Sequence, residues 1–215
     1  FEKYFSGEEF TPEEVIVGVS KGVKSGAIIP VFCGDALLMR GMEQFLDGLT
    51  WLLPTAADKA GEIGADIDGE PVDLSVNEDA ATAALCFKTI ADPFVGKVSF
   101  LKCIAGKVRQ DDSLLDMRTG NLEKIGKVVL MRGKKQEDMR VIPAGDIGAV
   151  LKLSNVATGD TLCAPTRKVT LDGIEYPAPS LRMAILPQTK GEEDKVAQSI
   201  AKLMEEDPSI RFENN

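Results

Sequence analysis

Basic side chains are the groups in this chain whose type and spacing suggest a chemical role. Residues 83–165 hold 13 Lys and Arg against 9 Asp and Glu, a net charge of +4, whereas the whole chain has a net charge of −9. Lysine and arginine at the turns of a folded domain can neutralise phosphates, so this block suggests a surface that faces a polyanion. The excess is modest, and an ordinary solvated surface is the alternative explanation.

Other side-chain chemistry has little support. Histidine is absent, which excludes histidine general acid–base catalysis, Ser–His triads and histidine metal ligands from these residues. The four cysteines, Cys33, Cys86, Cys103 and Cys163, are isolated and lack the paired spacing of a zinc or redox motif. We expect buried, reduced thiols in a cytoplasmic protein. No apolar run is long enough to span a bilayer, so we expect no membrane contact.

Phosphoryl transfer needs a glycine-rich loop around the nucleotide phosphates and ligands for a magnesium ion. Neither GxxxxGK[ST] nor the base-reading motif NKxD occurs in the sequence. We therefore expect these residues alone neither to hydrolyse GTP nor to bind it appreciably. The sequence looks like a piece of a larger protein, with the phosphate-handling residues upstream.

Helical and strand patterns alternate toward both ends of the chain. A capping box at Thr11 and Glu14 opens the first of three expected helices, and each helix has apolar residues on one face. Short apolar runs predict strands outside the basic block. The expected helices cover residues 11–26, 42–53 and 190–204, and the expected strands cover residues 27–32, 181–186 and 209–212.

Residues 56–82 are acidic and poor in large apolar side chains, which predicts a linker with a small hairpin around Asp68 and Gly69. After it, residues 83–165 alternate in the period of strands, separated by turn residues. Several short strands at this spacing predict a closed or nearly closed antiparallel β-barrel.

Three turn motifs punctuate the barrel: DPFVG at residues 92–96, AGDIGAV at 144–150 and TGDTLC at 158–163. A structural role explains them without a ligand. In the first, Pro93 fixes the turn, Phe94 packs, and Gly96 allows a backbone angle that other residues avoid. In the other two, the aspartate is expected to accept hydrogen bonds from nearby backbone.

The order of these pieces resembles elongation factor G, the ribosomal translocase among the translational GTPases. EKYFSGEEFTPEEV, AIIPVFCGDAL and RGMEQFLDGLTWLLPT are similar to the end of its GTP-binding domain. FKTIADPFVGKVSFLKCIAGKV, AGDIGAV and TGDTLC are similar to its second domain, and LPQTKGEEDKV and LMEEDPSIRF to the start of its third. The resemblance covers nearly the whole chain apart from the acidic segment.

The resemblance implies a multi-domain α+β protein. Residues 1–55 would end an α/β GTP-binding domain, 56–82 would be the linker, 83–165 the barrel of domain II, and 166–215 the start of a truncated ferredoxin-like βαβ domain III. It further implies GTP and magnesium in the intact parent, no cofactor in this segment, and a monomer whose barrel docks on small-subunit ribosomal RNA. The candidate RNA-contacting residues are Lys97, Lys102, Lys107, Arg109, Arg132, Lys134 and Lys135, with Lys124, Lys127 and Arg140 in the same block.

Two departures from the family pattern suggest a divergent paralogue. The family's fifth nucleotide-binding motif usually reads Gly-Ser-Ala, whereas this chain has Gly34, Asp35 and Ala36, a weak partial nucleotide contact. Asp111 stands where the family commonly has glycine. The leading hypothesis rests on the resemblance over nearly the whole chain: part of a GTPase that acts in translocation. The alternative, which the departure at Asp35 favours, is a non-translocating ribosome-binding or ribosomal-protection relative.

Overall fold

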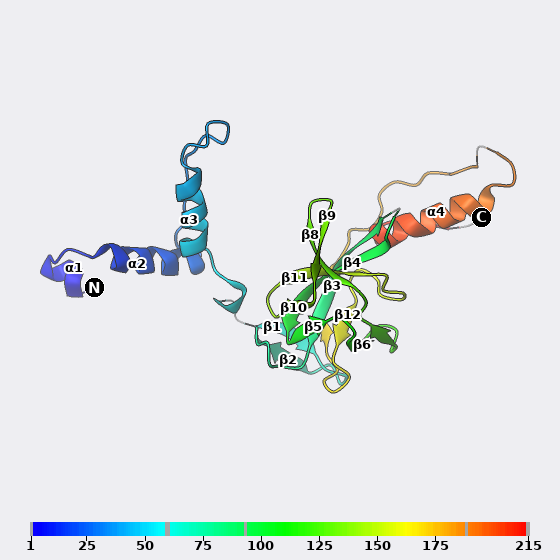
Figure 1. Ribbon diagram of the computed structural model, residues 1–215, viewed down its shortest axis with the longest axis horizontal. Helices are drawn as coiled ribbons and strands as arrows, with labels where there is room; N and C mark the ends of the chain where they lie inside the picture. The colour runs from blue at the N-terminus through cyan, green and yellow to red at the C-terminus, as the bar shows by residue number, and fades with distance from the viewer. Residues whose placement is uncertain (1, 59–60, 93, 188, 214–215) are drawn as a thin grey trace. The chain divides into compact units, whose positions relative to one another are not determined.

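The computed structural model describes residues 2–58, 61–92, 94–187 and 189–213 (Figure 1). It divides into two compact units, Phe1–Lys59 and Ala60–Asn215. No helix among the described residues is long and apolar enough to cross a membrane.

The first unit consists of three α-helices and one short 3-10 helix. They are α1 (Glu2–Ser6), α2 (Pro12–Lys24), α3 (Met42–Leu52) and η1 (Ala56–Asp58). The capping box of α2 is confirmed: the Thr11 hydroxyl accepts from the Glu14 amide, and the Glu14 carboxylate accepts from the Thr11 amide. Gly48 of α3 is the one buried residue described in this unit, so these helices enclose no hydrophobic core.

The strand expected over residues 27–32 is wrong. This stretch has no strand structure, and Ile29 and Val31 are each 84% exposed. A strand needs a hydrogen-bonded neighbour, and the described residues of this unit contain only an isolated bridge between Asp35 and Arg40. The apolar run therefore has no described strand to pair with, although Phe32 makes an edge-to-face contact with Phe45 at 5.5 Å.

The second unit is built on an eight-stranded antiparallel sheet with the order β7-β6-β12-β3-β4-β11-β8-β9. The longest pair, β3 (Ala83–Asp92) and β4 (Gly96–Ala105), forms its centre, with β11 (Ile147–Leu151) beside β4. The other strands are β6 (Ser113–Asp116), β7 (Leu122–Lys124), β8 (Val128–Arg132), β9 (Lys135–Met139) and β12 (Thr161–Cys163).

One hydrophobic core fills the inside of this sheet. It takes buried side chains from strands across the sheet and from the separate antiparallel pair β5 (Lys107–Arg109) and β10 (Val141–Pro143). Leu101 of β4, Val128 of β8 and Leu162 of β12 are all fully buried in the same cluster. A sheet that wraps around a shared core in this way confirms the expected antiparallel barrel and the α+β class.

The segment expected to be a linker is partly folded onto the barrel. β1 (Glu62–Ala65) and β2 (Pro71–Leu74) form the expected hairpin, and β1 also pairs with β13 (Thr170–Leu171). Leu74 is only 1% exposed because it packs with Val169 and Leu171 in a second hydrophobic cluster. Residues 62–74 therefore belong to the folded unit, which corrects the boundaries of the linker.

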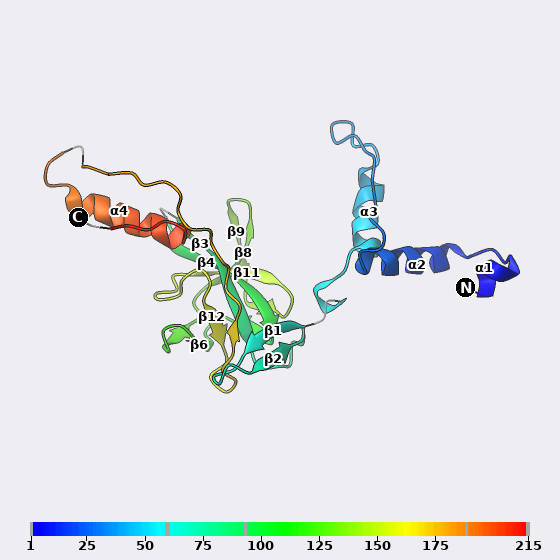
Figure 2. The ribbon, with the colours of Figure 1, turned by 180° about the vertical axis from the view of Figure 1, so that it is seen from behind.

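The C-terminal part contains one helix, α4 (Glu193–Glu206). Its end contacts the β3–β4 hairpin, where Glu206 accepts a hydrogen bond of 2.6 Å from the Ala91 amide (Figures 1 and 2). The strands expected over residues 181–186 and 209–212 are wrong: neither stretch pairs with another strand, and Leu186 is 85% exposed. As with residues 27–32, the described residues supply no strand to pair with them.

Candidate nucleic-acid interface

Three of the candidate RNA-contacting lysines are held in ion pairs with segments that flank the barrel. Lys97 lies 3.8 Å from Glu205 of α4, Lys102 lies 3.1 Å from Glu62 of β1, and Lys107 lies 2.7 Å from Glu78. These lysine side chains are 18–39% exposed. They tie α4, β1 and the segment after β2 to the barrel, so their charge is already largely matched within the molecule.

The positive charge of the barrel is concentrated elsewhere, in residues 124–140, which we call the basic ribbon. The ribbon contains six Lys and Arg and two Asp and Glu, a net charge of +4. This equals the net charge of all residues 83–165, so the rest of that block is neutral. Counting charge along shorter windows of the sequence would have found this concentration.

The ribbon owes its shape to the hairpin of β8 and β9. Arg132 pairs with Lys135 across a two-residue turn, Gly133-Lys134, in which Gly133 has a φ of 58°. Glycine is favoured at the first central position of such a turn, because it adopts positive φ at no steric cost. Val128 and Val129 anchor the base of the hairpin in the core, whereas residues 132–138 are all exposed. Figures 1 and 2 both show the hairpin projecting beyond the sheet, at the end opposite β1 and β2.

The ion pairs on the ribbon and beside it join side chains that are exposed to solvent. Lys127 lies 2.6 Å from Asp138, Arg132 lies 3.3 Å from Glu137, and Lys124 lies 3.7 Å from Asp111. The side chains in these pairs are 46–79% exposed, and pairs of this kind contribute little to stability. A phosphate can therefore replace the carboxylate at small cost.

Four of the ten basic candidate residues have no ion-pair partner within the described ranges: Arg109, Lys134, Lys135 and Arg140. Lys134 and Lys135 lie at the tip of the ribbon. Arg140 lies at its base, where its carbonyl accepts a 3.1 Å hydrogen bond from the amide of Gln110, next to Arg109. The two arginines and Lys127 line a hollow of about 530 Å³, together with the carboxylates Asp111 and Asp138. Cationic groups thus gather at both ends of one hairpin.

The partial nucleotide motif forms a tight turn in the first unit. Asp35 and Arg40 exchange two backbone hydrogen bonds of 2.9 and 3.0 Å, and the Asp35 carboxylate accepts from the amides of Leu37 and Leu38. The aspartate therefore caps its own turn, as expected for this residue type. The structure contains no hydrogen bond from the amide of Ala36 to another described residue.

The DPFVG turn presents its aromatic ring to solvent. Asp92 accepts hydrogen bonds of 2.9 Å from the Val95 amide and 2.8 Å from the Phe94 amide, and these bonds lower the pKa of its carboxyl group. Gly96 has a φ of 80°, in line with its expected role. Phe94, however, is 96% exposed, so the expectation that it packs is wrong. Pro93 lies outside the described residues.

The two aspartate turns hold their expected bonds, and one of them also binds a distant arginine. Asp146 accepts from the Ile147 amide at 2.8 Å, and Asp160 accepts from the Ala157 amide at 2.6 Å. Asp160 is 5% exposed and also receives two hydrogen bonds from the guanidinium of Arg118, which raise the pKa of that arginine. Sequence reasoning missed this pair, because the two residues are 42 positions apart and share no motif.

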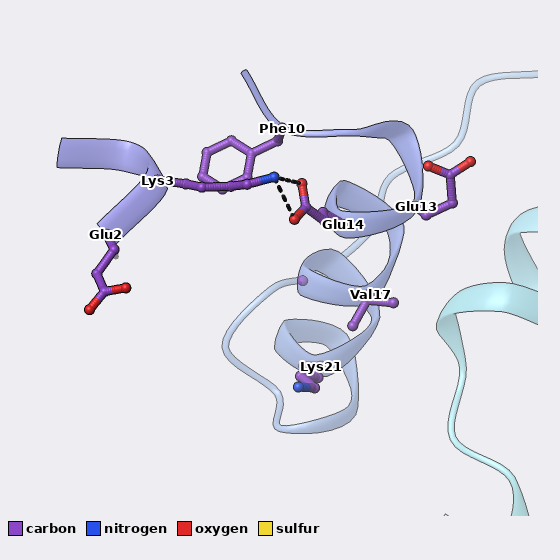
Figure 3. A pocket seen from close by; sticks show the side chains of 8 residues that line it. Glu2, Lys3, Phe10, Glu13, Glu14, Val17 and Lys21 are labelled. Atoms are coloured by element: carbon purple, nitrogen blue, oxygen red, sulfur yellow. Dashed lines mark hydrogen bonds and ion pairs between the residues drawn. The ribbon is translucent and has the colours of Figure 1, made fainter. Parts of the chain in front are cut away.

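The described residues of the first unit also form a hollow. A hollow of about 670 Å³ beside α1 and α2 is lined by charged and apolar side chains, and in Figure 3 the Lys3 ammonium points at both carboxylate oxygens of Glu14. Within residues 2–58, 61–92, 94–187 and 189–213, no three Cys, Asp or Glu side chains lie close enough together to hold a metal ion.

A central antiparallel barrel with an exposed basic hairpin, preceded and followed along the chain by helical segments, defines a multi-domain α+β protein of the translation-factor type. Comparison with known protein families leads to the same class of protein. Residues 81–165 match the family described as elongation factor G domain 2, and residues 176–215 match elongation factor G, domain III. Both matches name one parent family and together cover more than half of the chain, so the chain belongs to the elongation factor G family.

A solved crystal structure of a protein from Thermus thermophilus has the same fold. It superposes with a TM-score of 0.78 over 99% of this chain, at 24% sequence identity. This chain spans 30% of the length of that protein.

Proposed function

We propose that this chain is part of a translational GTPase that acts on the ribosome in translocation, and that its barrel docks on small-subunit ribosomal RNA. The observation that carries the proposal is the basic ribbon, residues 124–140, which holds the whole net positive charge of residues 83–165 on and beside the exposed β8–β9 hairpin. Contacts between lysine or arginine and phosphate give affinity with little reading of sequence, as a docking domain requires.

GTP and magnesium belong to the proposal for the intact protein only. No phosphate loop or base-reading motif lies in this sequence, so hydrolysis would depend on residues outside it. The turn at Gly34, Asp35 and Ala36 fits a peripheral contact to the base, because the Ala36 amide is left for an acceptor while the Asp35 carboxylate is used within the turn. A cytoplasmic location follows from the proposed ribosomal role.

The test is co-sedimentation of the 215-residue chain with purified small ribosomal subunits at about 50 to 200 mM salt. We expect the logarithm of the association constant to fall linearly with the logarithm of the salt concentration. Absence of binding, or binding that salt does not weaken, would contradict the proposal. In a parallel titration, micromolar binding of GTP to the chain would contradict the expectation that these residues alone do not hold the nucleotide.

A further inference from the structure

The helix α4 meets the barrel at one rung of the β3–β4 hairpin, where Ala91 lies opposite Lys97. The carboxylate of Glu206 accepts a hydrogen bond of 2.6 Å from the Ala91 amide. The neighbouring Glu205 carboxylate lies 3.8 Å from the Lys97 ammonium, and the Lys97 side chain is 18% exposed. Two consecutive glutamates of α4 therefore bind the two residues of a single rung.

The Ala91 amide is available to a carboxylate because of its place in the sheet. In an antiparallel ladder, every second pair of opposite residues directs its backbone groups away from the partner strand. The Lys97 carbonyl accepts from the Lys152 amide at 2.8 Å, on the β11 side of β4, so Lys97 and Ala91 form such a pair. On the other side of β3, β12 pairs with residues 83–85 in the described structure. Glu206 thus binds an amide at an open sheet edge.

The DPFVG motif fixes the turn next to this rung. Asp92 follows Ala91 and accepts hydrogen bonds from the amides of Phe94 and Val95. These bonds close the end of the hairpin, so Ala91 stays opposite Lys97. The motif therefore holds together the two residues that α4 contacts.

The last turn of α4 carries its negative charge where an isolated helix is destabilised by it. Acidic side chains near a helix C-terminus oppose the helix dipole, and this turn contains no basic residue. Glu205 and Glu206 end the helix, and Asp207 follows directly. Residues that break a local rule are expected at functional sites. Here the rung supplies a donor and a cation that offset the cost only while α4 is docked.

Apolar packing adds little to these contacts. Ile200 is the one buried residue of α4, and Leu203 is 51% exposed. The connection from β13 to α4, residues 172–192, has no helix or strand in its described part and is mostly exposed. It would reach about 70 Å if fully extended, so the connection does not itself fix the position of the helix.

We propose that Glu205 and Glu206 form a reversible latch, which docks α4 on the rung of Ala91 and Lys97 and releases it on the long connection. The Glu205 side chain is 49% exposed, so salt screens its ion pair and favours release. The latch joins the region that matches elongation factor G domain 2 to the region that matches domain III. It goes beyond the proposed function and does not depend on it, because every contact lies within this chain.

The experiment measures the distance between α4 and the barrel by double electron–electron resonance. Spin labels are attached at Lys168→Cys on the barrel and at Gln198→Cys on α4, in a Cys33→Ser background. Both labelled positions are exposed, and the three remaining native cysteines are buried. The labels therefore report the position of the helix without touching the latch.

Three variants separate the latch from a general effect of charge. The latch variant is Glu205→Ala with Glu206→Ala, because alanine preserves the helix. The matched control is Asp172→Ala with Glu175→Ala, two exposed acids of the connection with no ion-pair partner among the described residues. The third variant is Lys97→Glu, which reverses the charge of the rung, and adding Glu205→Lys to it restores an attractive pair. Circular dichroism verifies that each variant folds.

At about 0.1 M salt we expect one narrow distance distribution for the parent chain and for the control variant. The latch variant and Lys97→Glu should give broad distributions that extend to longer distances, and adding Glu205→Lys should recover the narrow one. Raising the salt to about 1 M should broaden the distribution of the parent, and lowering it again should reverse the change.

Other outcomes overturn the inference in distinguishable ways. A narrow distribution in the latch variant would mean that the packing around Ile200 holds α4. Equal broadening in the control would mean that net charge acts and not the two glutamates. A parent that is broad at every salt concentration would show that α4 does not dock, and one that stays narrow at high salt would show that the contact does not release. None of these results bears on the proposed function, because no ribosome is present.

Discussion

At the scale of single residues, burial distinguishes protected cysteine thiols from one that reagents can reach. Cys86, Cys103 and Cys163 are buried, as expected, whereas Cys33 is exposed, which corrects the expectation for that residue. Burial raises the pKa of Cys86 to about 11 and that of Cys103 to about 12. Because the thiolate is the reactive form, we expect iodoacetamide at about pH 8 to modify Cys33 alone. Peptide mapping that finds Cys86 or Cys103 modified before Cys33 would contradict the fold.

The same thiols predict a loss of stability in alkali. Burial disfavours the thiolate of Cys86 in the folded chain, so its pKa there lies above the unfolded value of 9.0. Well below that value the thiol is neutral in both states, and the stability does not depend on its titration. Above that value the unfolded chain loses its proton first, and we expect the free energy of unfolding to fall between about pH 9 and 12. Denaturant unfolding at a series of pH values measures it, and Cys86→Ala should make the decline shallower. An unchanged decline would show that other groups cause it.

Asp111 illustrates a departure from the family pattern that has a structural cost. Its φ is 71°, in the left-handed region that glycine adopts freely. We expect Asp111→Gly to raise the free energy of unfolding by about 0.5 to 1 kcal/mol, because the exposed pair with Lys124 contributes little. Asp111→Ala, which keeps the strained β-carbon, is the control and should not stabilise the chain. Urea unfolding that finds the glycine variant less stable than the parent would contradict this.

At the scale of elements, the hairpin of β1 and β2 shows how composition misleads. Its acidic residues predict a linker, but Leu74 is buried in a cluster that closes only when β13, far later in the chain, pairs with β1. We expect Leu74→Ala to lower the free energy of unfolding by about 3 kcal/mol. Ile63→Ala, at a side chain 67% exposed, is the matched control and should change it little. Equal stability of the two variants would mean that the hairpin is not part of the core.

Sequence patterns predicted best those elements that are defined by their own neighbouring residues. The capping box of α2, the helices α2, α3 and α4, and the strands β3 and β4 are of this kind and were recovered. β9 and β10 were missed because β9 is largely exposed along its length and β10 has only three residues. The strands predicted over residues 27–32 and 181–186 are absent from the structure. An apolar run becomes a strand only where another strand is present to pair with it.

The sequence located the basic side chains in the barrel but did not show how they are arranged on its surface. Basic composition and turn positions pointed to the barrel, and Arg132, Lys134 and Lys135 do lie together on one hairpin. Ion pairs with Glu62, Glu78 and Glu205 depend on tertiary contacts, so no count of sequence charge could separate the paired lysines from the unpaired ones. Which cations contact RNA stays a prediction.

At the scale of the whole molecule, the two units differ in what stabilises them. The barrel unit has continuous buried clusters, whereas the described residues of the first unit bury only Gly48. We expect amide hydrogens of residues 2–58 to exchange quickly and those of β3, β4 and β11 to exchange slowly, because exchange there requires the core to open. Hydrogen-exchange mass spectrometry of the 215-residue chain provides the measurement. Slow exchange in α2 and α3 would reveal a core that these helices do not have in this structure.

Docking of the domain II barrel on ribosomal RNA through the basic ribbon can be tested by tethered hydroxyl-radical probing. An iron chelate is attached to a cysteine introduced as Lys134→Cys in a Cys33→Ser background, and the chain is bound to small ribosomal subunits. The matched position is Asp68→Cys, in the β1–β2 turn at the opposite end of the unit (Figures 1 and 2). We predict cleavage of ribosomal RNA from residue 134 and much weaker cleavage from residue 68. Cleavage from residue 68 alone, with the chain bound in both cases, would contradict docking through the ribbon.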